Sequence, residues 1–558
     1  MKRSKKIILI IVSVTIGYLL STFSSSKKYA SIVTGHPEAT KIGEYILSIG
    51  GNAIDASIST QLALAVCFPR AGNIGGGGFM IYRTEDGEAY SLDFREKAPL
   101  GSTKNMYLDD NGDVIDSLST YGGLSVGVPG TISGIFDAHK KFGTLSIEQL
   151  FNPVINLAER GFAINKRQAS LLNKHKKDFI KYNPKNQYFI KNTDWKAGDT
   201  LKQKDLANTL KIIRDGGRES FYNGEITKKI IESLDNKSIL NSEDFKKYQS
   251  IWREPIETKI NNYKIISMPP PSSGGIALSQ LLLMIFNLEL DKKHNSVEYI
   301  HLLSELEKLV YSDRSKYLGD NDFYPVPKDS LLNIKYILSR IANINLNKAR
   351  TSSDVGPGKF LNKESEETTH FSIVDFEGNA VSVTTTLNTN YGSKVFVNDL
   401  GFLLNNEMDD FSSKPGYPNT YGLVGSEANS IEPEKRMLSS MTPTIIEKDR
   451  KLFLVLGSPG GSTIITSVFQ TILNVILFHM DIQSAVDAPR FHHQWLPDLI
   501  FLENNSFSKS TMDSLILLGH KIKERGTMGH VNAIELNDYI RFGADRRGSN
   551  YGITISKD

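Results

Sequence analysis

The first predicted elements of this chain are two helices near its start. Between Pro37 and Gly50 the apolar residues recur every three to four positions, and that spacing predicts an amphipathic helix that ends at Gly50-Gly51. Asn52 can cap a second helix, which is expected to stop before Pro69. Residues 37–66 are therefore expected to form two consecutive helices.

Alternating apolar and polar residues predict strands elsewhere. An acidic residue followed by glycine separates two such runs at Asp86-Gly87 and two more at Glu377-Gly378, which is typical of tight hairpin turns. The expected strands are 79–83, 89–94, 370–375, 380–386, 444–446 and 452–456, and a helix is expected after Gly460-Gly461, as far as residue 478.

The middle of the chain has a different pattern. Residues from about 145 to 345 are predicted to be mostly helical, with a break at the Pro- and Gly-rich segment 269–275. Residues 351–367 are small, polar and acidic, so we expect an exposed linker there. Strands resume directly after it. Strands paired with helices in this way indicate stacked sheets between helical layers.

Composition and charge exclude several classes of protein. The chain has 558 residues, of which 40% are hydrophobic and 23% are charged, an ordinary globular balance and not that of a disordered or fibrous protein. The formal net charge of +3 is too small to indicate binding to nucleic acid. The single cysteine, Cys67, excludes an intramolecular disulfide, a zinc finger and an iron–sulfur cluster. Its apolar neighbours predict a buried structural thiol.

The N-terminus is predicted to be an export signal or an anchor. Four cations within the first six residues precede an apolar run over 7–23, and small residues follow it. Subtracting these four charges from +3 leaves −1 for the rest of the chain. We expect residues 1–26 to be a cleaved signal or, as the second interpretation, an uncleaved tether to the inner membrane through residues 7–23. The body is then periplasmic or secreted.

One segment indicates a nucleophile. Thr368 follows Glu366-Glu367 at the end of the linker and begins a strand. A hydroxyl is a weak nucleophile unless a base removes its proton, and the α-amine of an N-terminal Thr can be that base if the chain is cut before it. The alternative is an ordinary Thr-rich edge strand.

Three further segments could complete such a site. Thr386 and Asn388 lie one hairpin strand away, and strand alternation puts them on one face, although ordinary pairing of strand threonines is the alternative. The carboxylates and amides of residues 405–410 could hold an ammonium group or a hard metal ion, or form a solvated loop. Gly460-Gly461 before a helix could be an oxyanion site or a tight turn.

Two motifs are discounted. The glycine run 72–78 lacks the Gly-Lys-Ser/Thr of a phosphate loop and precedes a strand, which is the wrong order for a dinucleotide fingerprint. His492-His493 are adjacent and face apart on a strand, so they are not expected to bind a metal ion together. No metal or cofactor is expected.

Taken together, these segments closely resemble the γ-glutamyltransferase family of N-terminal-nucleophile hydrolases. The resemblance covers about residues 33–556. It is carried by residues 50–56, 75–79, 92–99, 127–130, 270–275, 368–370, 405–411, 438–441, 457–462 and 488–497.

The resemblance implies an α+β fold, a four-layer αββα sandwich formed jointly by two subunits of one precursor. Cleavage before Thr368 would give a large subunit, 27–367, and a small catalytic subunit, 368–558, which remain together as a heterodimer. The enzyme would transfer the γ-glutamyl group of glutathione and related γ-glutamyl compounds to water or to amino acid or peptide acceptors through an acyl-enzyme.

The resemblance also implies a role for each matching residue. Thr368 would be the nucleophile, supported by Thr386, with Gly460 and Gly461 as the oxyanion hole. One set of residues would bind the substrate α-carboxylate, and another would bind its α-ammonium group. A lid loop over residues 414–425 would carry the residue that gates access to the site. The carboxylate set is Arg95, Ser439 and Ser440; the ammonium set is Asn388, Glu407 and Asp410; the gate is Tyr421.

Two alternatives remain beside this interpretation. One is an amidase similar to the related cephalosporin acylases, against which the lid and Asp410 argue, because glutaryl substrates would leave that acid unpaired. The other is a catalytically silent binding protein that kept the fold, against which the intact Thr368 and Arg95 argue.

Overall fold

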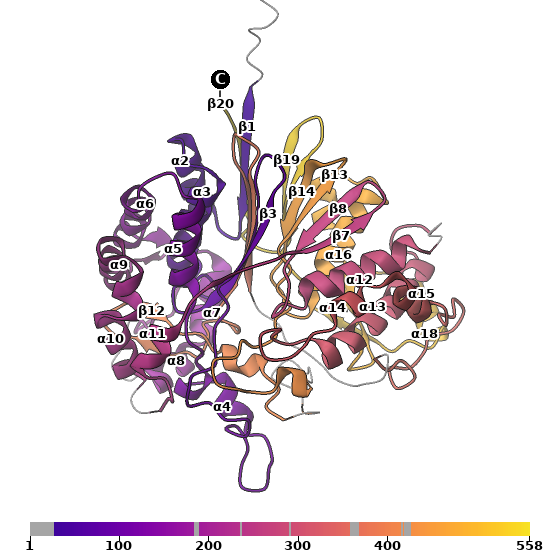
Figure 1. Ribbon diagram of the computed structural model, residues 1–558, viewed down its shortest axis with the longest axis horizontal. Helices are drawn as coiled ribbons and strands as arrows, with labels where there is room; N and C mark the ends of the chain where they lie inside the picture. The colour runs from indigo at the N-terminus through magenta and orange to yellow at the C-terminus, as the bar shows by residue number, and fades with distance from the viewer. Residues whose placement is uncertain are drawn as a thin grey trace, which may run out of the picture.

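Two β-sheets lie face to face at the centre of the molecule, and helices cover the outer face of each (Figure 1). This computed structural model describes residues 27–183, 189–234, 237–288, 292–357, 368–414, 417 and 426–557. The expected four-layer αββα sandwich is confirmed.

The first sheet joins strands from both sides of the predicted cleavage point. Strand β9 begins one residue after Thr368 and lies between β1 and β10. In sheet order the strands are β20 (Tyr551–Lys557), β1 (Lys28–Thr34), β9 (Thr369–Val374), β10 (Ala380–Thr386), β2 (Gly77–Arg83), β3 (Ala89–Asp93) and β6 (Ile251–Arg253).

The second sheet also combines strands from both sides of the predicted cleavage point. Two of its strands precede residue 367 and four follow it. In sheet order they are β19 (Ile540–Ala544), β18 (Asn532–Leu536), β14 (Lys451–Gly457), β13 (Thr444–Lys448), β8 (Tyr263–Ser267) and β7 (Ile256–Ile260). Smaller sheets use β4 (Phe162–Ala163), β5 (Thr200–Leu201), β11 (Phe396–Val397), β12 (Phe402–Leu403), β15 (Phe491–His492), β16 (Ile500–Glu503) and β17 (Ile522–Arg525).

The two helical layers come from different parts of the chain (Figure 1). The layer on the first sheet contains α2 (Pro37–Ser48), α3 (Ala53–Cys67), α5 (Thr131–Phe142), α6 (Ile147–Arg160) and α9 (Lys204–Tyr222), with α4 (Asp116–Thr120), α7 (Lys166–Lys174), α8 (Lys176–Tyr182), α10 (Glu225–Ser233) and α11 (Ser242–Lys247) nearby. The layer on the second sheet contains α12 (Gly274–Phe286), α13 (Val297–Tyr317), α16 (Thr463–Ile476) and α17 (Ile482–Asp487), with α14 (Lys328–Leu331), α15 (Ile334–Ile341) and α18 (Lys509–Leu517).

Strand alternation divides the apolar residues of the first sheet between two cores. Ile32 packs with the helices of the first layer, whereas its neighbour Val33 packs between the sheets. Phe371 and Ile373 of β9 likewise face the first helical layer. Cys67 lies in that same core as a buried free thiol, as expected, and burial raises the pKa of this thiol well above its usual value.

The other face of β9 and β10 is polar although it is buried between the sheets. The His370 ring bonds Thr384 Oγ1 through Nδ1 at 2.9 Å and Ser372 Oγ through Nε2 at 3.0 Å. Burial lowers the pKa of His370 to about 3, so the ring is neutral. Ser382 connects the sheets directly, because its hydroxyl donates to the Leu456 carbonyl at 3.0 Å.

Most of the predicted elements are present. The two helices of residues 37–66 are α2 and α3, the hairpins at Asp86-Gly87 and Glu377-Gly378 form, and the helix after Gly460-Gly461 begins at Thr463. The prediction of a mostly helical region over 145–345 is wrong for residues 251–267, which form β6, β7 and β8. A two-residue turn at Asn261-Asn262, with Asn261 at φ +52°, joins β7 to β8.

The predicted leader, 1–26, lies outside the described residues. Among the residues that the structure does describe, no helix has the length and apolar character needed to cross a membrane. The linker is described only as far as residue 357.

A substitution at Gly457, which packs against His370, tests the packing between the two sheets. A Cβ added at Gly457 would lie 2.4 Å from His370 Cε1, and the ring cannot move aside without losing its two hydrogen bonds. We expect Gly457→Ala to lower the free energy of unfolding by about 1–3 kcal/mol through overpacking, measured as a lower midpoint of thermal unfolding. Gly526→Ala is the control, because its Cβ would meet nothing within 4 Å; equal midpoints for the two variants would contradict the packing argument.

Candidate active site

The segments predicted to form a site all emerge at one end of the sandwich. Thr385 of β10 pairs with Thr369 of β9, so the next position places Thr386 opposite Thr368. Thr386 also pairs with Gly77 of β2. A Cβ at Gly77 would lie 2.5 Å from the Phe94 carbonyl, which precedes Arg95. The register of the four adjacent strands β9, β10, β2 and β3 therefore places Thr368, Thr386 and the segment around Arg95 at the same end of the first sheet.

The second sheet contributes from the same end. Thr444 begins β13 and pairs with Leu456 near the end of β14, and the Thr444 N–H donates to Ser382 Oγ in the first sheet at 3.0 Å. Ser439 and Ser440 precede β13, and Gly460 and Gly461 follow β14. The serine pair and the glycine pair therefore both lie beyond the ends of these strands, at the same end of the sandwich as Thr368.

Thr368 has the position expected of a nucleophile. Its side chain is buried, and among the described residues Oγ1 has no hydrogen-bond partner. Thr386 is also buried, and its Oγ1 accepts a hydrogen bond from the Asn388 N–H at 2.7 Å. The prediction that Thr386 and Asn388 share one face of a strand is wrong, because β10 ends at Thr386 and Asn388 has φ +70°. A turn brings the two residues together instead.

Arg95 is fixed at both its backbone and its guanidinium. Its N–H donates to Asp93 Oδ1 at 2.9 Å, and its carbonyl accepts from the Tyr248 hydroxyl at 2.7 Å. The guanidinium donates from Nη1 to Glu407 Oε1 and from Nη2 to Asp410 Oδ2, the latter at 2.5 Å. The residue expected to bind a carboxylate is thus paired here with both acids expected to bind an ammonium group.

Glu407 and the neighbouring Glu96 are buried beside Arg95, and burial shifts the pKa values of both acids. Burial raises the pKa of Glu407 well above its usual value, and Arg95 opposes that shift. Burial also raises the pKa of Glu96, to about 8. Glu96 lies 4.0 Å from Arg95 Nη1, and among the described residues its carboxylate oxygens accept no hydrogen bond. At neutral pH Glu96 is therefore largely protonated.

The remaining predicted residues are also brought to this end. Asn388 Nδ2 donates to the Asn406 carbonyl at 2.9 Å, next to Glu407. The Ser439 N–H donates to the Pro271 carbonyl at 3.0 Å, so the Pro- and Gly-rich break at 269–275 supports the serine pair.

Gly460 and Gly461 have the geometry of an anion site. Their φ values are +131° and +56°, conformations that favour glycine. Their carbonyls accept from Thr463 and Ile464 at the start of α16, whereas their N–H groups donate to no described residue. Two N–H groups at a helix N-terminus can stabilise an oxyanion.

Comparison with known proteins identifies the family. The sequence profile of the family described as Gamma-glutamyltranspeptidase matches residues 39–555. The chain belongs to this family. It is 43% identical over 511 residues to the "Glutathione hydrolase proenzyme" of Escherichia coli (strain K12), covering 91% of this chain and 88% of the relative.

Two solved structures agree with the fold of this γ-glutamyltranspeptidase family member. The crystal structure of cephalosporin acylase from Bacillus halodurans has a TM-score of 0.84 at 25% identity, covering 94% of this chain and 96% of that chain. A chain of Helicobacter pylori gamma-glutamyltranspeptidase is 44% identical with a TM-score of 0.57, and it covers 58% of this chain and 94% of its own length. This chain is therefore an enzyme with the N-terminal-nucleophile hydrolase fold.

Two asparagines position the site of this family member: Asn73, which was given no role from the sequence, and Asn405, which lies in the predicted ligand segment 405–410. Asn73 donates from Nδ2 to the Thr386 carbonyl at 2.6 Å and accepts from the Gly76 N–H at 3.0 Å. Asn405 accepts from the Glu407 N–H at 3.0 Å and donates to the Gly75 carbonyl at 2.9 Å. Asn73 lies in the glycine run 72–78 that was discounted as a phosphate loop, so this run is structural.

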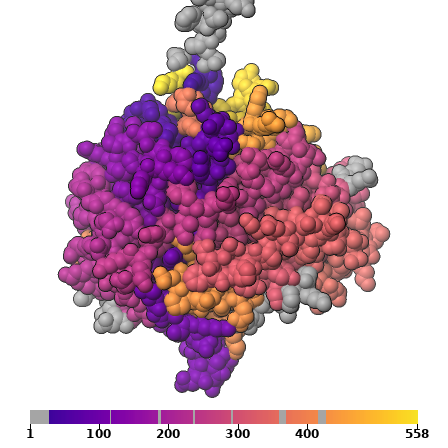
Figure 2. All heavy atoms as spheres, in the orientation of Figure 1, coloured from indigo at the N-terminus to yellow at the C-terminus, as the bar shows by residue number. Residues whose placement is uncertain are grey.

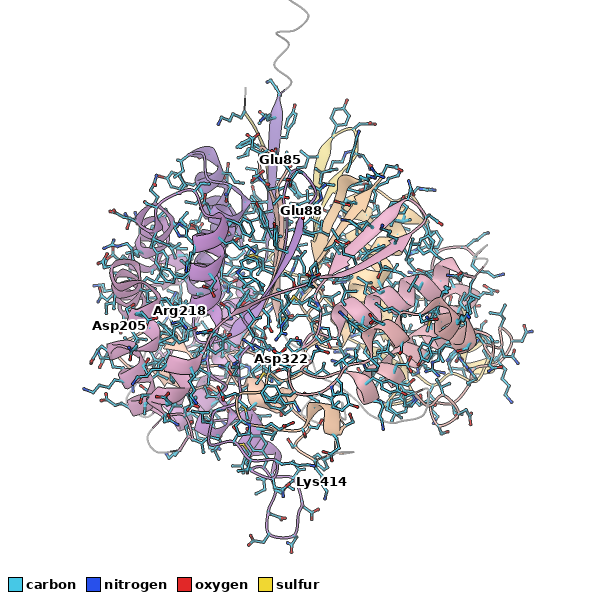
Figure 3. The ribbon with its side chains drawn as sticks, viewed as in Figure 1. Glu85, Glu88, Asp205, Arg218, Asp322 and Lys414 are labelled. Carbon is cyan, nitrogen blue, oxygen red and sulfur yellow. The ribbon has the colours of Figure 1, made fainter. Side chains whose placement is uncertain are left out.

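Most of the predicted lid, Tyr421 included, lies outside the described residues, which are only Lys414 and Tyr417 in the range 414–425. Lys414, labelled in Figure 3, donates from Nζ to the Gly112 carbonyl at 2.6 Å. In Figure 2 orange atoms of the C-terminal third lie against purple atoms of the N-terminal part on this side. Consistent with that contact, Ser119 Oγ donates to Asp409 Oδ1 at 2.7 Å.

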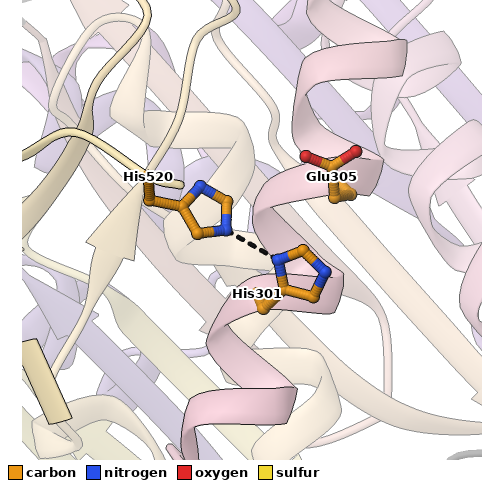
Figure 4. A group of neighbouring side chains, drawn as sticks. All are labelled: His301, Glu305 and His520. Carbon is orange, nitrogen blue, oxygen red and sulfur yellow. Dashed lines mark hydrogen bonds between the residues drawn. The ribbon is translucent and has the colours of Figure 1, made fainter. Parts of the chain in front are cut away.

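A buried group outside the site contains potential metal ligands. Ligand atoms of His301, Glu305 and His520 all lie within 4.8 Å of one another (Figure 4). The two imidazoles bond each other at 2.7 Å, and Glu305 accepts from Lys308 Nζ at 2.9 Å and from Arg350 Nε at 2.6 Å. These donors and acceptors already satisfy one another, and the adjacent Lys308 would repel a cation. We therefore assign this group a structural role.

The raised pKa of Glu96 predicts a pH-dependent stability. The folded protein holds this proton up to a pH of about 8, whereas the ordinary value is 4.5. As pH rises through this window, the unfolded chain releases the proton first, so the contribution of protonated Glu96 to stability is lost. We expect the unfolding midpoint of Glu96→Gln, relative to wild type, to rise between about pH 5 and about pH 8. A difference that does not change with pH would contradict a buried, protonated Glu96.

Proposed function

We propose that this family member hydrolyses the γ-glutamyl amide of glutathione and related compounds after cutting its own chain before Thr368. The observation that carries the proposal is the buried Thr368 hydroxyl just before β9, at the same sheet end as the ion pair of buried Arg95 with partly buried Asp410. The first group can attack a carbonyl, and the second can recognise a zwitterion. The names of the relatives support glutathione as the substrate.

Self-cleavage is supported by the way the two parts share their sheets. In the precursor, the Thr368 hydroxyl attacks the Glu367 carbonyl, the peptide C–N bond breaks, and the nitrogen stays on Thr368 as the new α-amine. Water then hydrolyses the ester that links the parts. Because β9 pairs with β1 on one side and β10 on the other, the products 27–367 and 368–558 remain together as a heterodimer.

The new α-amine then acts as the base in turnover. It takes the Thr368 hydroxyl proton as the oxygen attacks the γ-glutamyl carbonyl, and it returns a proton to the departing amine. The N–H groups of Gly460 and Gly461 stabilise the oxyanion, a contribution of about 100- to 1000-fold in rate for each donor. Water, or the amine of an amino acid or peptide acceptor, then attacks the acyl-enzyme and releases Thr368.

Substrate recognition is an exchange of ion pairs. Arg95 and Asp410 are in contact at 2.5 Å. A γ-glutamyl group carries a carboxylate and an ammonium group on one carbon, so the carboxylate can take the place of Asp410 on Arg95 while the ammonium takes the place of Arg95 on Asp410. Glu407 and Asn388 assist at the ammonium, and Ser439 and Ser440 assist at the carboxylate. No buried charge is then left without a partner.

The cephalosporin acylase alternative is less well supported, although the fold is similar. A glutaryl group lacks the ammonium, so it would compete for Arg95 and leave the partly buried Asp410 unpaired. The 43% identity to a glutathione hydrolase also favours γ-glutamyl substrates.

Export is a separate part of the proposal. The basic residues before the apolar run 7–23 support a periplasmic or secreted enzyme, with this run as a signal or as a tether to the inner membrane.

Replacing the nucleophile tests the mechanism. Thr368→Ala removes the attacking hydroxyl, so we expect one uncut band in denaturing electrophoresis where wild type shows two, and a loss of glutathione hydrolysis of at least about a thousandfold. Thr369→Ala is the matched control, because that side chain faces Gly35 on the helical side of the sheet; it should be cut and active. Cleavage or turnover by the Thr368 variant would refute the assignment.

Asp410→Asn tests the ammonium role. We expect kcat/KM for γ-glutamyl-p-nitroanilide to fall by about 10- to 100-fold, the range for a lost charged hydrogen bond, while glutaryl-p-nitroanilide is unaffected or improved. Asp409→Asn, whose carboxylate accepts from Ser119, should alter both substrates alike. A loss of equal size for both substrates in Asp410→Asn would remove its role in selectivity.

A further inference from the structure

A second arginine, Arg314, lies next to the serine pair Ser439-Ser440, which is proposed to bind the substrate α-carboxylate. Arg314 is near the C-terminal end of α13 and is only 2% exposed. No local sequence pattern marks Arg314, because its contacts are with residues far away in the chain.

The guanidinium of Arg314 contacts both the Pro- and Gly-rich segment 269–275 and the serine pair Ser439-Ser440. Its Nε donates to Ser273 Oγ at 2.7 Å, and its Nη2 donates to Ser440 Oγ at 3.3 Å. Ser273 in turn donates from both its N–H and its hydroxyl to the Ser439 carbonyl, each at 2.7 Å. One buried cation therefore connects the Pro- and Gly-rich segment to the serine pair.

These contacts determine which hydrogen bonds the Ser439 and Ser440 hydroxyls can make to a ligand. A hydroxyl has one proton and two lone pairs. Ser439 Oγ accepts from the Met441 N–H at 3.1 Å, and Ser440 Oγ accepts from Arg314. With a lone pair used in this way, each hydroxyl can direct its proton to an anionic group, and accepting from a cation makes the Ser440 hydroxyl a stronger donor.

The charge of Arg314 also acts on the serine pair. Burial lowers the pKa of Arg314 to about 9, while Tyr311 and Asp410 oppose the shift. The guanidinium is therefore still charged at neutral pH. Together with Arg95 it makes the environment of Ser440 favourable for a carboxylate.

We propose that Arg314 is a positioning residue for the substrate α-carboxylate, which acts through Ser440 by orienting and polarising its hydroxyl. This inference rests on the proposed function, because it deepens the account of how that site selects a γ-glutamyl group.

The test compares two substrates that differ only at the α-carbon. One is γ-glutamyl-p-nitroanilide, and the other has its α-carboxylate replaced by a carboxamide. We expect Arg314→Gln to lower kcat/KM for the carboxylate substrate by about 10- to 100-fold, mainly through KM, and that for the carboxamide by less than about threefold. Arg314→Lys keeps the charge but cannot reach both serines, so it should fall between wild type and Arg314→Gln.

A double-mutant cycle distinguishes action through Ser440 from a general structural effect. In the Ser440→Ala background, Arg314→Gln should have little further effect on the carboxylate substrate. Arg340→Gln is the matched control, because Arg340 is ion-paired with the neighbouring Asp313 at 3.0 Å. We expect that variant to lose thermal stability with an unchanged ratio between the two substrates.

Equal losses for both substrates, or losses that add fully in the double variant, would overturn the proposal. If the Arg314 variants do not mature, Ser273→Ala decides the question, since it removes one anchor of the guanidinium: a selective loss of about threefold or more for the carboxylate substrate supports the proposal, and an unselective loss overturns it. Wild type without γ-glutamyl turnover would instead contradict the proposed function itself.

Discussion

The pairing of β9 into the centre of the first sheet is the constraint on which the rest of this structure depends. Thr368 comes immediately before that strand, so the register of β9 with β10 determines where the nucleophile lies. Because β1 and β10 bond β9 from both sides, a cut before Thr368 would release a chain end without separating the strands. Maturation and catalysis can then use one hydroxyl in one fixed place.

The same constraint explains why charges can be buried at this end. Arg95 is held by Asp93 and Tyr248, so its guanidinium is not free to reach solvent and must be neutralised where it is. Asp410 does this through its contact with Nη2, and Glu407 accepts a further hydrogen bond from Nη1. Removing one member of such a pair leaves a buried charge without a partner, which is costly. A zwitterion is the ligand that can replace both partners at once, so the electrostatics favour an α-amino acid group.

The sequence predicted those parts of the fold that depend on local signals. Asp86-Gly87 and Glu377-Gly378 mark hairpins through turn chemistry, and Asn52 marks a helix through its cap; all three are present. The strands around Asn261 were missed because they are short and lie within a helical region. Asn388 meets Thr386 through a turn with positive φ, which alternation cannot anticipate. The site residues came largely from resemblance to a family, whereas the roles of Arg314 and Asn73 depend on contacts distant in sequence. Burial and register decide those contacts, and neither is visible in a local pattern.

The most direct test of this account is the identity of the first residue of the smaller chain in the mature protein. N-terminal sequencing, together with the intact mass of both chains, should give Thr-Thr-His-Phe-Ser, the sequence that begins at Thr368. A single uncut chain in an active preparation, or a smaller chain that begins at any other residue, would contradict the claim that Thr368, just before β9, is both the cleavage point and the nucleophile.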